Sequence, residues 1–291
     1  MFSSKKHLFV IGNPRSGTSL FRIMLNSHSK MTIPPECGFI HWWYEKYKSW
    51  DKEYSISNFV TDLKTSKKIE TWDLDFSDLE RFLQKEVPQD YKELVFKITE
   101  FYGHSKLNKA DQHVLGDKNN YYIKHLKEIK EISPEAFFIF LIRDPKAVFS
   151  SYKEIQKLKT DSSYKPDLSL NVTDFIEEWL KNHKNILDFI NGLKKNKFLI
   201  VSYEQLVVKT EDELRRTSKF LDLRFESEML NYYKTNDEPS GLLDWKQKTL
   251  QPPDQTSIII YKERLTRDEI FNIEAQTNSL FNCLLNQQYL E

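Results

Sequence analysis

The sequence predicts a three-layer α/β fold in which helices flank a mostly parallel central sheet. Short apolar runs alternate with stretches of helical periodicity along most of the chain, which is typical of parallel strands joined by helices. The first apolar run is followed at once by a glycine-containing loop and then by a helical pattern. The 291 residues, 39% of them hydrophobic, suffice for one large domain and exclude general disorder.

Individual elements follow from runs of β-branched and aromatic residues for strands, and from apolar residues three or four positions apart for helices. We expect strands at residues 7–12, 94–98, 112–116, 137–142 and 198–203. We expect helices at residues 18–28, 119–132, 145–157 and 173–195. Two later helices are expected to begin with capping boxes, Thr210 with Glu213 and Thr266 with Glu269.

Two regions fall outside this alternation of strands and helices. Residues 39–90 are polar and aromatic, and we expect a helical cap, an insertion on the acceptor side of a single domain that spans residues 1–291. The aromatic side chains of residues 42–50 form either the wall of an acceptor pocket or the core of this cap. Residues 158–171 lack apolar periodicity and are predicted to form a mobile surface loop near the site.

Composition excludes several classes of function. The 43 basic and 43 acidic residues balance, so the protein has no net positive charge that would attract nucleic acid. No apolar run reaches the roughly 18 residues of a membrane span, and the first is too short for a signal peptide. Cys37 and Cys283 are expected to be reduced thiols of a cytoplasmic protein. The chain has neither HExxH nor CxxC, so no metal is expected.

Residues 12–19 read Gly-Asn-Pro-Arg-Ser-Gly-Thr-Ser, between the first strand and the first helix. This arrangement presents backbone N–H groups and a helix N-terminus to a phosphate. The chain has only 7 glycines, yet Gly12 and Gly17 stand at the ends of this loop. Thr18 occupies the lysine position of the P-loop pattern, and the nearest cation is Arg15. The loop predicts a P-loop-like fold without ordinary ATP chemistry, the alternative being a turn that binds nothing.

A second anion site is predicted after the apolar run at residues 137–142. Asp144 can cap the following helix, and Pro145 suits its first position. Arg143 stands at the carboxyl end of the strand, where α/β sheets bind ligands. Ser151 follows about two helical turns along, so the two side chains could hold a second phosphate. The alternative is a capped helix whose arginine pairs with a nearby acid.

Together these motifs resemble those of sulfotransferases that use 3′-phosphoadenosine 5′-phosphosulfate (PAPS). Residues 14–19 look like their 5′-phosphosulfate loop, and residues 143–151 look like their 3′-phosphate motif. Residues 201–206 and 261–266 are similar to later family segments. The chain most resembles the tyrosylprotein sulfotransferases and their bacterial relatives, which also have arginine in the loop. The resemblance covers most of the chain and is weakest over residues 39–90.

The resemblance implies in-line transfer of a sulfuryl group from PAPS to a hydroxyl, without a metal. It implies that Arg15 stabilises the leaving phosphate, that Glu36 is the general base, and that Lys118 approaches the transferred group. Taken without the resemblance, Glu36 and Lys118 are also compatible with solvated surface charges, and Tyr203 with a core position. The nucleotide-binding residues that the resemblance implies are Pro14, Arg15, Ser16, Gly17, Thr18, Ser19, Arg143, Ser151 and Tyr203.

The implied acceptor carries a hydroxyl, as a peptide tyrosine, a glycan or a small molecule does, and nothing in the sequence indicates an oligomeric state. Two other functions remain open. A P-loop phosphotransferase or nucleotide hydrolase would need magnesium, for which Asp117 and Asp144 are the candidates, and a non-catalytic module would bind a nucleotide without turnover. Lys246 and Lys248 match the family pattern poorly and receive no role. Cys37 has no histidine partner nearby in the sequence, so covalent catalysis is not expected.

Overall fold

The computed structural model describes residues 5–50 and 55–287 and has five parallel strands at its centre. The strands are β1 (Lys6–Gly12), β2 (Met31–Thr32), β3 (Val114–Lys118), β4 (Phe137–Ile142) and β5 (Phe198–Ser202). Their order in the sheet is β2-β3-β1-β4-β5. The strand that precedes the glycine loop is therefore central, with β4 directly beside it.

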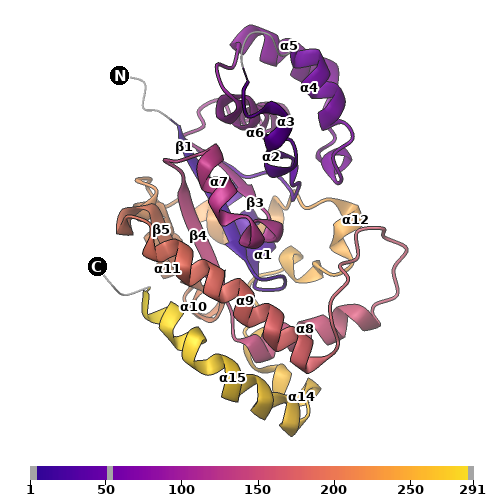
Figure 1. Ribbon diagram of the computed structural model, residues 1–291, viewed down its shortest axis with the longest axis vertical. Coiled ribbons are helices and arrows are strands. Elements are labelled where there is room, and N and C mark those ends of the chain that lie inside the picture. Colours follow the sequence, from indigo (N-terminus) through magenta and orange to yellow (C-terminus); the bar gives the residue numbers. More distant parts are fainter. Residues whose placement is uncertain (1–4, 51–54, 288–291) are drawn as a thin grey trace.

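Both faces of the sheet are covered, because alternate residues of each strand point to opposite sides. Phe9 and Ile11 of β1 belong to a core cluster with α6 (Tyr91–Leu107) and α7 (Leu126–Ile132). Leu8 and Val10 belong to a second cluster with α1 (Thr18–Asn26) and α10 (Tyr203–Val208). The strands are apolar on both faces for this reason, and the predicted three-layer arrangement is confirmed (Figure 1).

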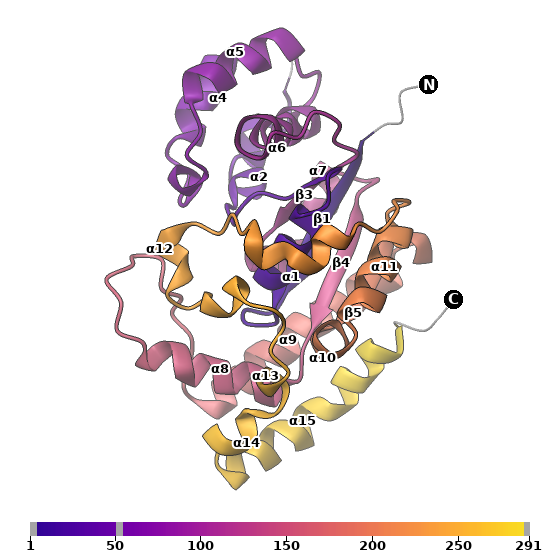
Figure 2. The same ribbon diagram turned by 180° about the vertical axis from the view of Figure 1, so that it is seen from behind.

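The remaining helices extend these two layers. They are α8 (Pro145–Lys157), α9 (Val172–Asn191), α11 (Thr210–Phe220), α12 (Ser240–Leu243), α13 (Thr256–Ile259), α14 (Tyr261–Arg264) and α15 (Arg267–Asn286). Short 3-10 helices are η1 (Ile69–Trp72), η2 (Asn120–Lys124), η3 (Lys195–Lys197), η4 (Ser227–Lys234) and η5 (Gln247–Leu250). Figure 2 shows α12 beyond the tip of the sheet, between the cap and α8. None of the described helices is both long and apolar enough to cross a membrane.

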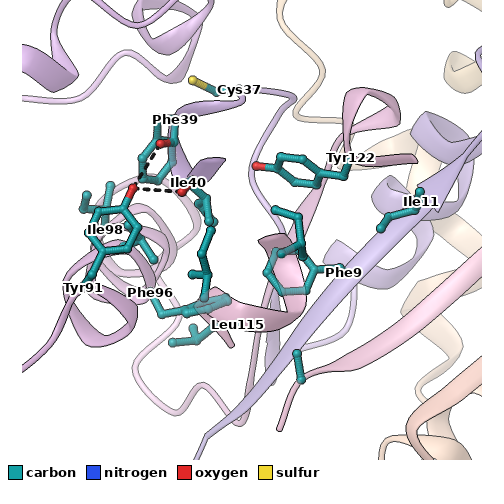
Figure 3. Close-up of a cluster of buried hydrophobic side chains, with 14 of the residues drawn as sticks. Phe9, Ile11, Cys37, Phe39, Ile40, Tyr91, Phe96, Ile98, Leu115 and Tyr122 are labelled. Carbon is teal, nitrogen blue, oxygen red and sulfur yellow. Dashed lines mark hydrogen bonds between the residues drawn. The ribbon is translucent and has the colours of Figure 1, made fainter. Parts of the chain in front are cut away.

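The described part of residues 39–90 forms the predicted helical cap at one end of the molecule (Figure 1). Its helices are α2 (Phe39–Trp42), α3 (Tyr44–Tyr47), α4 (Ile56–Leu63) and α5 (Phe76–Glu86). Figure 3 shows how α2 is joined to α6, where the Tyr91 hydroxyl donates a 2.8 Å hydrogen bond to the Ile40 carbonyl. Tyr47 and Trp50 are buried in the core, so these aromatic residues stabilise the cap.

Some predicted elements are wrong. Residues 94–98 lie inside α6 rather than in a strand. A short apolar run does not distinguish a strand from a helix that is buried on several faces, which explains the wrong prediction. The helix predicted at 119–132 is interrupted at His125, between η2 and α7. Thr210 is the first residue of α11 and caps nothing, whereas the capping box at Thr266 is confirmed. The short strand β2 was not predicted.

Candidate active site

The glycine loop between β1 and α1 has the conformation of an anion cradle. Gly17 has a φ of 91°, and a Cβ atom there would lie 2.4 Å from the ring of Tyr203. Only glycine fits this position without displacing that ring. Arg15 also has a positive φ of 69°, and its carbonyl accepts a hydrogen bond from the Arg143 guanidinium. The chain therefore accepts backbone strain at this loop, which is common at ligand sites.

The second motif lies beside the first, because β4 pairs with β1. The Asp144 carboxylate caps α8 by accepting a 2.8 Å bond from the Lys146 amide, and Pro145 is the first helical residue, as predicted. Arg143 lies between the loops, with its guanidinium carbon 4.2 Å from the centre of the Tyr203 ring. The tyrosine is thus the common neighbour of both motifs.

Among the residues that the structure describes, the two arginines of these motifs form no ion pair, and Arg143 is buried whereas Arg15 is partly buried. Arg15 donates to the Ser151 hydroxyl at 3.1 Å and to the Trp245 carbonyl at 3.0 Å. Arg143 donates to the carbonyls of Arg15 and Ser257, both at 2.8 Å, and its buried Nε has no described acceptor.

This arrangement favours an anion between the arginines. Burial, and next the charge of Arg143, lower the pKa of Arg15 to about 10. Buried charges are normally paired, because desolvating an isolated charge is costly. A phosphate or sulfate would neutralise both guanidinium groups and supply the missing acceptors.

Glu36 is held by two lysines at the end of β3. Its carboxylate lies 2.7 Å from Lys118 Nζ and 2.6 Å from Lys68 Nζ. Burial raises the pKa of Glu36, but the charges of Lys118, Lys68 and Lys246 lower it by more. The net pKa therefore lies well below the ordinary value. Glu36 is therefore a carboxylate in the resting protein, flanked by cations that can also contact a sulfonate.

A buried charge network continues from this point toward α1. Lys246 forms an ion pair with Glu238, whose other oxygen lies 2.8 Å from Arg22. Burial raises the pKa of Glu238, but Lys246 and Arg22 lower it to about 2. Burial lowers the pKa of Lys246 to about 8. Sequence reasoning noted Lys246 without giving it a role, and it missed Lys68 and Glu238 altogether.

One cavity of about 330 Å³ connects the two motifs with Glu36. The predicted residues that line it are Pro14, Arg15, Gly17, Thr18, Ser19, Glu36, Arg143, Ser151 and Tyr203. Two predicted residues do not line the cavity. The side chain of Ser16 is buried within the loop, and Lys118 is connected to the cavity by its ion pair with Glu36. Aromatic side chains that line the cavity are Tyr121, Tyr164, Tyr203 and Trp245.

The segment at residues 158–171 contains neither helix nor strand, as predicted, and part of it borders this cavity. The Tyr164 hydroxyl contacts the Glu70 carboxylate of the cap. The Ser162 hydroxyl donates a 2.7 Å bond to the Gly241 carbonyl. The segment is thus tied to the elements on two sides of the opening.

Replacing Cys37 by alanine is expected to leave kcat within about threefold of wild type. The thiol is buried in the cap core (Figure 3) and donates to the Lys67 carbonyl at 3.5 Å. Burial raises the pKa of the thiol far above its ordinary value, so it is not a thiolate at neutral pH. Steady-state kinetics of the variant provide the measurement, and a loss beyond a hundredfold in a folded variant would restore a covalent role for the cysteine.

Comparison with known proteins agrees with this geometry. A model of the sulfotransferase family matches residues 7–227. A protein-tyrosine sulfotransferase of Drosophila melanogaster is 24% identical over 235 residues, which are 81% of this chain and 42% of that protein. A putative protein-tyrosine sulfotransferase of Caenorhabditis briggsae is 24% identical over 78% of this chain and 69% of its own length.

Solved structures share the fold. The sulfotransferase domain of the Synechococcus olefin synthase superposes with a TM-score of 0.64 at 20% identity, covering 97% of this chain and 96% of that domain. The sulfotransferase domain from the curacin biosynthetic pathway gives 0.61 at 21% identity, covering 94% of this chain and 98% of that domain. Since the family model matches most of the chain and includes both anion motifs, the protein belongs to the sulfotransferase family.

Proposed function

We propose that the protein transfers a sulfuryl group from PAPS to a hydroxyl acceptor. The observation that carries this proposal is the pair of arginines without an ion pair in the described part of the chain, the buried Arg143 and the partly buried Arg15, in the cavity that also contains Glu36. PAPS has one phosphate at its 3′ position and a phosphosulfate at its 5′ position. Two cation-bearing loops on adjacent strands match such a ligand, because each loop can hold one of its anionic groups.

In this proposal the nucleotide lies across the two loops. The backbone of residues 14–19 holds the 5′-phosphosulfate, while Arg143 and Ser151 hold the 3′-phosphate. Tyr203 lies against Gly17 and below Arg143, where its ring can contact the adenosine. Arg15 bonds Ser151 in the structure, so we expect its guanidinium to turn toward the 5′-phosphosulfate when the nucleotide occupies the cavity.

Glu36 is the proposed general base. The acceptor oxygen forms a bond to sulfur while the bond from sulfur to the 5′-phosphate oxygen breaks, and the hydroxyl proton passes to Glu36. Lys118 and Lys68 hold the carboxylate in the resting state. When a sulfonate attracts these lysines, their hold on Glu36 weakens and its pKa rises, which makes it a better base. Arg15 stabilises the charge that develops on the leaving phosphate.

The acceptor is proposed to be a hydroxyl on a peptide tyrosine, a glycan or a small molecule. Two of the relatives reported above are named protein-tyrosine sulfotransferases, which favours a phenol. The cap and the segment at residues 158–171 border the cavity, so we assign acceptor selection to them. The aromatic walls provided by Tyr121 and Tyr164 are suited to a flat acceptor.

Nucleotide binding and transfer can be tested separately. Titration calorimetry with 3′-phosphoadenosine 5′-phosphate should give one site per chain, and ATP with magnesium should give little heat. Radiolabelled PAPS should then label tyrosine peptides, glycans or phenols in an acceptor screen. Binding without labelling of any acceptor would support a non-catalytic module, and magnesium-dependent ATP hydrolysis would support a phosphotransferase instead.

The ion pairs of Glu36 are expected to stabilise the protein above about pH 4.5 and to lose this effect as the pH falls. The pKa of Glu36 is depressed in the folded protein, so protonation favours the unfolded chain, where the pKa is ordinary. The melting temperatures of wild type and Glu36→Gln should therefore differ most at neutral pH and converge in acid. A difference that grows toward low pH would contradict this assignment.

A further inference from the structure

A compact group of potential metal ligands lies where the cap meets α7. His41 is in α2, His125 directly precedes α7, and Glu128 is in the first turn of α7. One donor atom from each side chain lies within 4.8 Å of the other two, and residues 5–50 and 55–287 contain no second group of this kind. The centres of the two imidazole rings are 4.1 Å apart. Nδ1 of His125 lies 3.7 Å from Oε1 of Glu128.

These donor atoms are almost close enough to bind one ion. Ligand atoms of a tetrahedral zinc site lie about 2.0–2.2 Å from the metal, and hence roughly 3.4 Å from one another. Closing the group therefore takes a displacement of roughly 1 Å per side chain. All three side chains are partly exposed, so they have room for this change by rotation about their own bonds.

The chemistry of the three donors favours a transition metal over calcium or magnesium. Two imidazoles and one carboxylate are ligands that zinc prefers, whereas the harder cations take oxygen donors. The Tyr121 hydroxyl lies 3.4 Å from Nδ1 of His41, which leaves Nε2 of that ring for an ion.

We propose that His41, His125 and Glu128 form a binding site for a divalent transition metal, with Zn²⁺ as the best match. This proposal departs from the expectation of no metal, which rested on the absence of short motifs. Its ligands come from two distant segments, and only the spacing of His125 and Glu128, three residues apart at the start of a helix, is visible in the sequence.

The site joins α2 of the cap to α7, which packs on the sheet. A bound ion would therefore fasten the cap to the central domain. Tyr121, which lines the cavity, has its ring centre 4.3 Å from that of His125 and 5.5 Å from that of His41. The ion would fix this tyrosine at the wall of the cavity, and it would support the acceptor side rather than take part in transfer.

The test uses untagged protein of residues 1–291, freed of metal with a chelator. Titration calorimetry with Zn²⁺ should show one equivalent bound with micromolar or tighter affinity, and bound Co²⁺ should show the visible absorption of a low-symmetry site. Zn²⁺ should also raise the melting temperature. His41→Ala and Glu128→Gln should each weaken Zn²⁺ binding by about tenfold or more. None of these measurements depends on sulfuryl transfer, so their failure would leave the proposed function intact.

The matched control is His113→Ala. His113 has a carboxylate neighbour, Asp111 at 3.0 Å, but within residues 5–50 and 55–287 it belongs to no group of three potential ligands, so its replacement should leave the affinity unchanged. Wild-type protein that binds no Zn²⁺ would overturn the proposal, as would His41→Ala protein that binds Zn²⁺ as tightly as wild type. If His41→Ala does not fold, Glu128→Gln decides, because this exposed residue can be replaced without changing side-chain volume.

Discussion

Replacement of Glu36 by glutamine is expected to lower kcat by roughly 10²–10⁴-fold, the usual contribution of a general base. Glutamine keeps the size of the side chain but accepts no proton from the attacking hydroxyl. Affinity for 3′-phosphoadenosine 5′-phosphate should change by less than about threefold, because the phosphate groups are assigned to other side chains. Single-turnover rates with radiolabelled PAPS, together with calorimetry, measure the two effects separately.

Glu211→Gln is the matched control for this variant. Glu211 is an exposed residue whose carboxylate pairs with Arg215 at 2.6 Å, and it does not line the cavity. Its kcat should stay within about threefold of wild type. If Glu36→Gln retains more than a third of the wild-type kcat while folded, Glu36 is not the base. Melting curves identify a variant that loses activity by unfolding.

The two anion motifs could be predicted from the sequence because their geometry is local. Each has a strand, a short loop and a helix N-terminus in consecutive residues, and parallel strands place the loops at one edge of the sheet. Gly17 illustrates the limit of this reasoning. Its place in the loop was evident from the sequence, but its close approach to the Tyr203 ring was not, because that approach depends on the pairing of β4 with β5, which no local pattern contains.

The charges around Glu36 could not be predicted in the same way. Lys68 belongs to the cap and reaches Glu36 across 32 residues of sequence, and Lys246 comes from a segment without apolar periodicity. A lysine in such a segment looks like any solvated surface charge until the fold buries it. The same reason explains the error at residues 94–98, because burial on several faces removes the periodicity that distinguishes a helix from a strand.

Replacement of Arg143 by alanine is expected to weaken binding of 3′-phosphoadenosine 5′-phosphate by roughly 10²–10⁴-fold. Each hydrogen bond to a charged group contributes about 1.5–3 kcal/mol, and a guanidinium can donate two of them to one phosphate. Arg143→Lys should recover only part of this loss, because lysine supplies the charge without the planar pair of donors. Calorimetric titration of the three proteins at one fixed ionic strength gives the affinities.

A ligand without the 3′-phosphate separates this contact from damage to the loop, since Arg143 also donates to the carbonyls of Arg15 and Ser257. Adenosine 5′-phosphate should bind wild type and Arg143→Ala with affinities that agree within about threefold, so that the loss belongs to the 3′-phosphate alone. Equal losses for both ligands would mean that Arg143 only shapes the loop. Arg215→Ala, which removes an exposed arginine paired with Glu211, should leave both affinities unchanged.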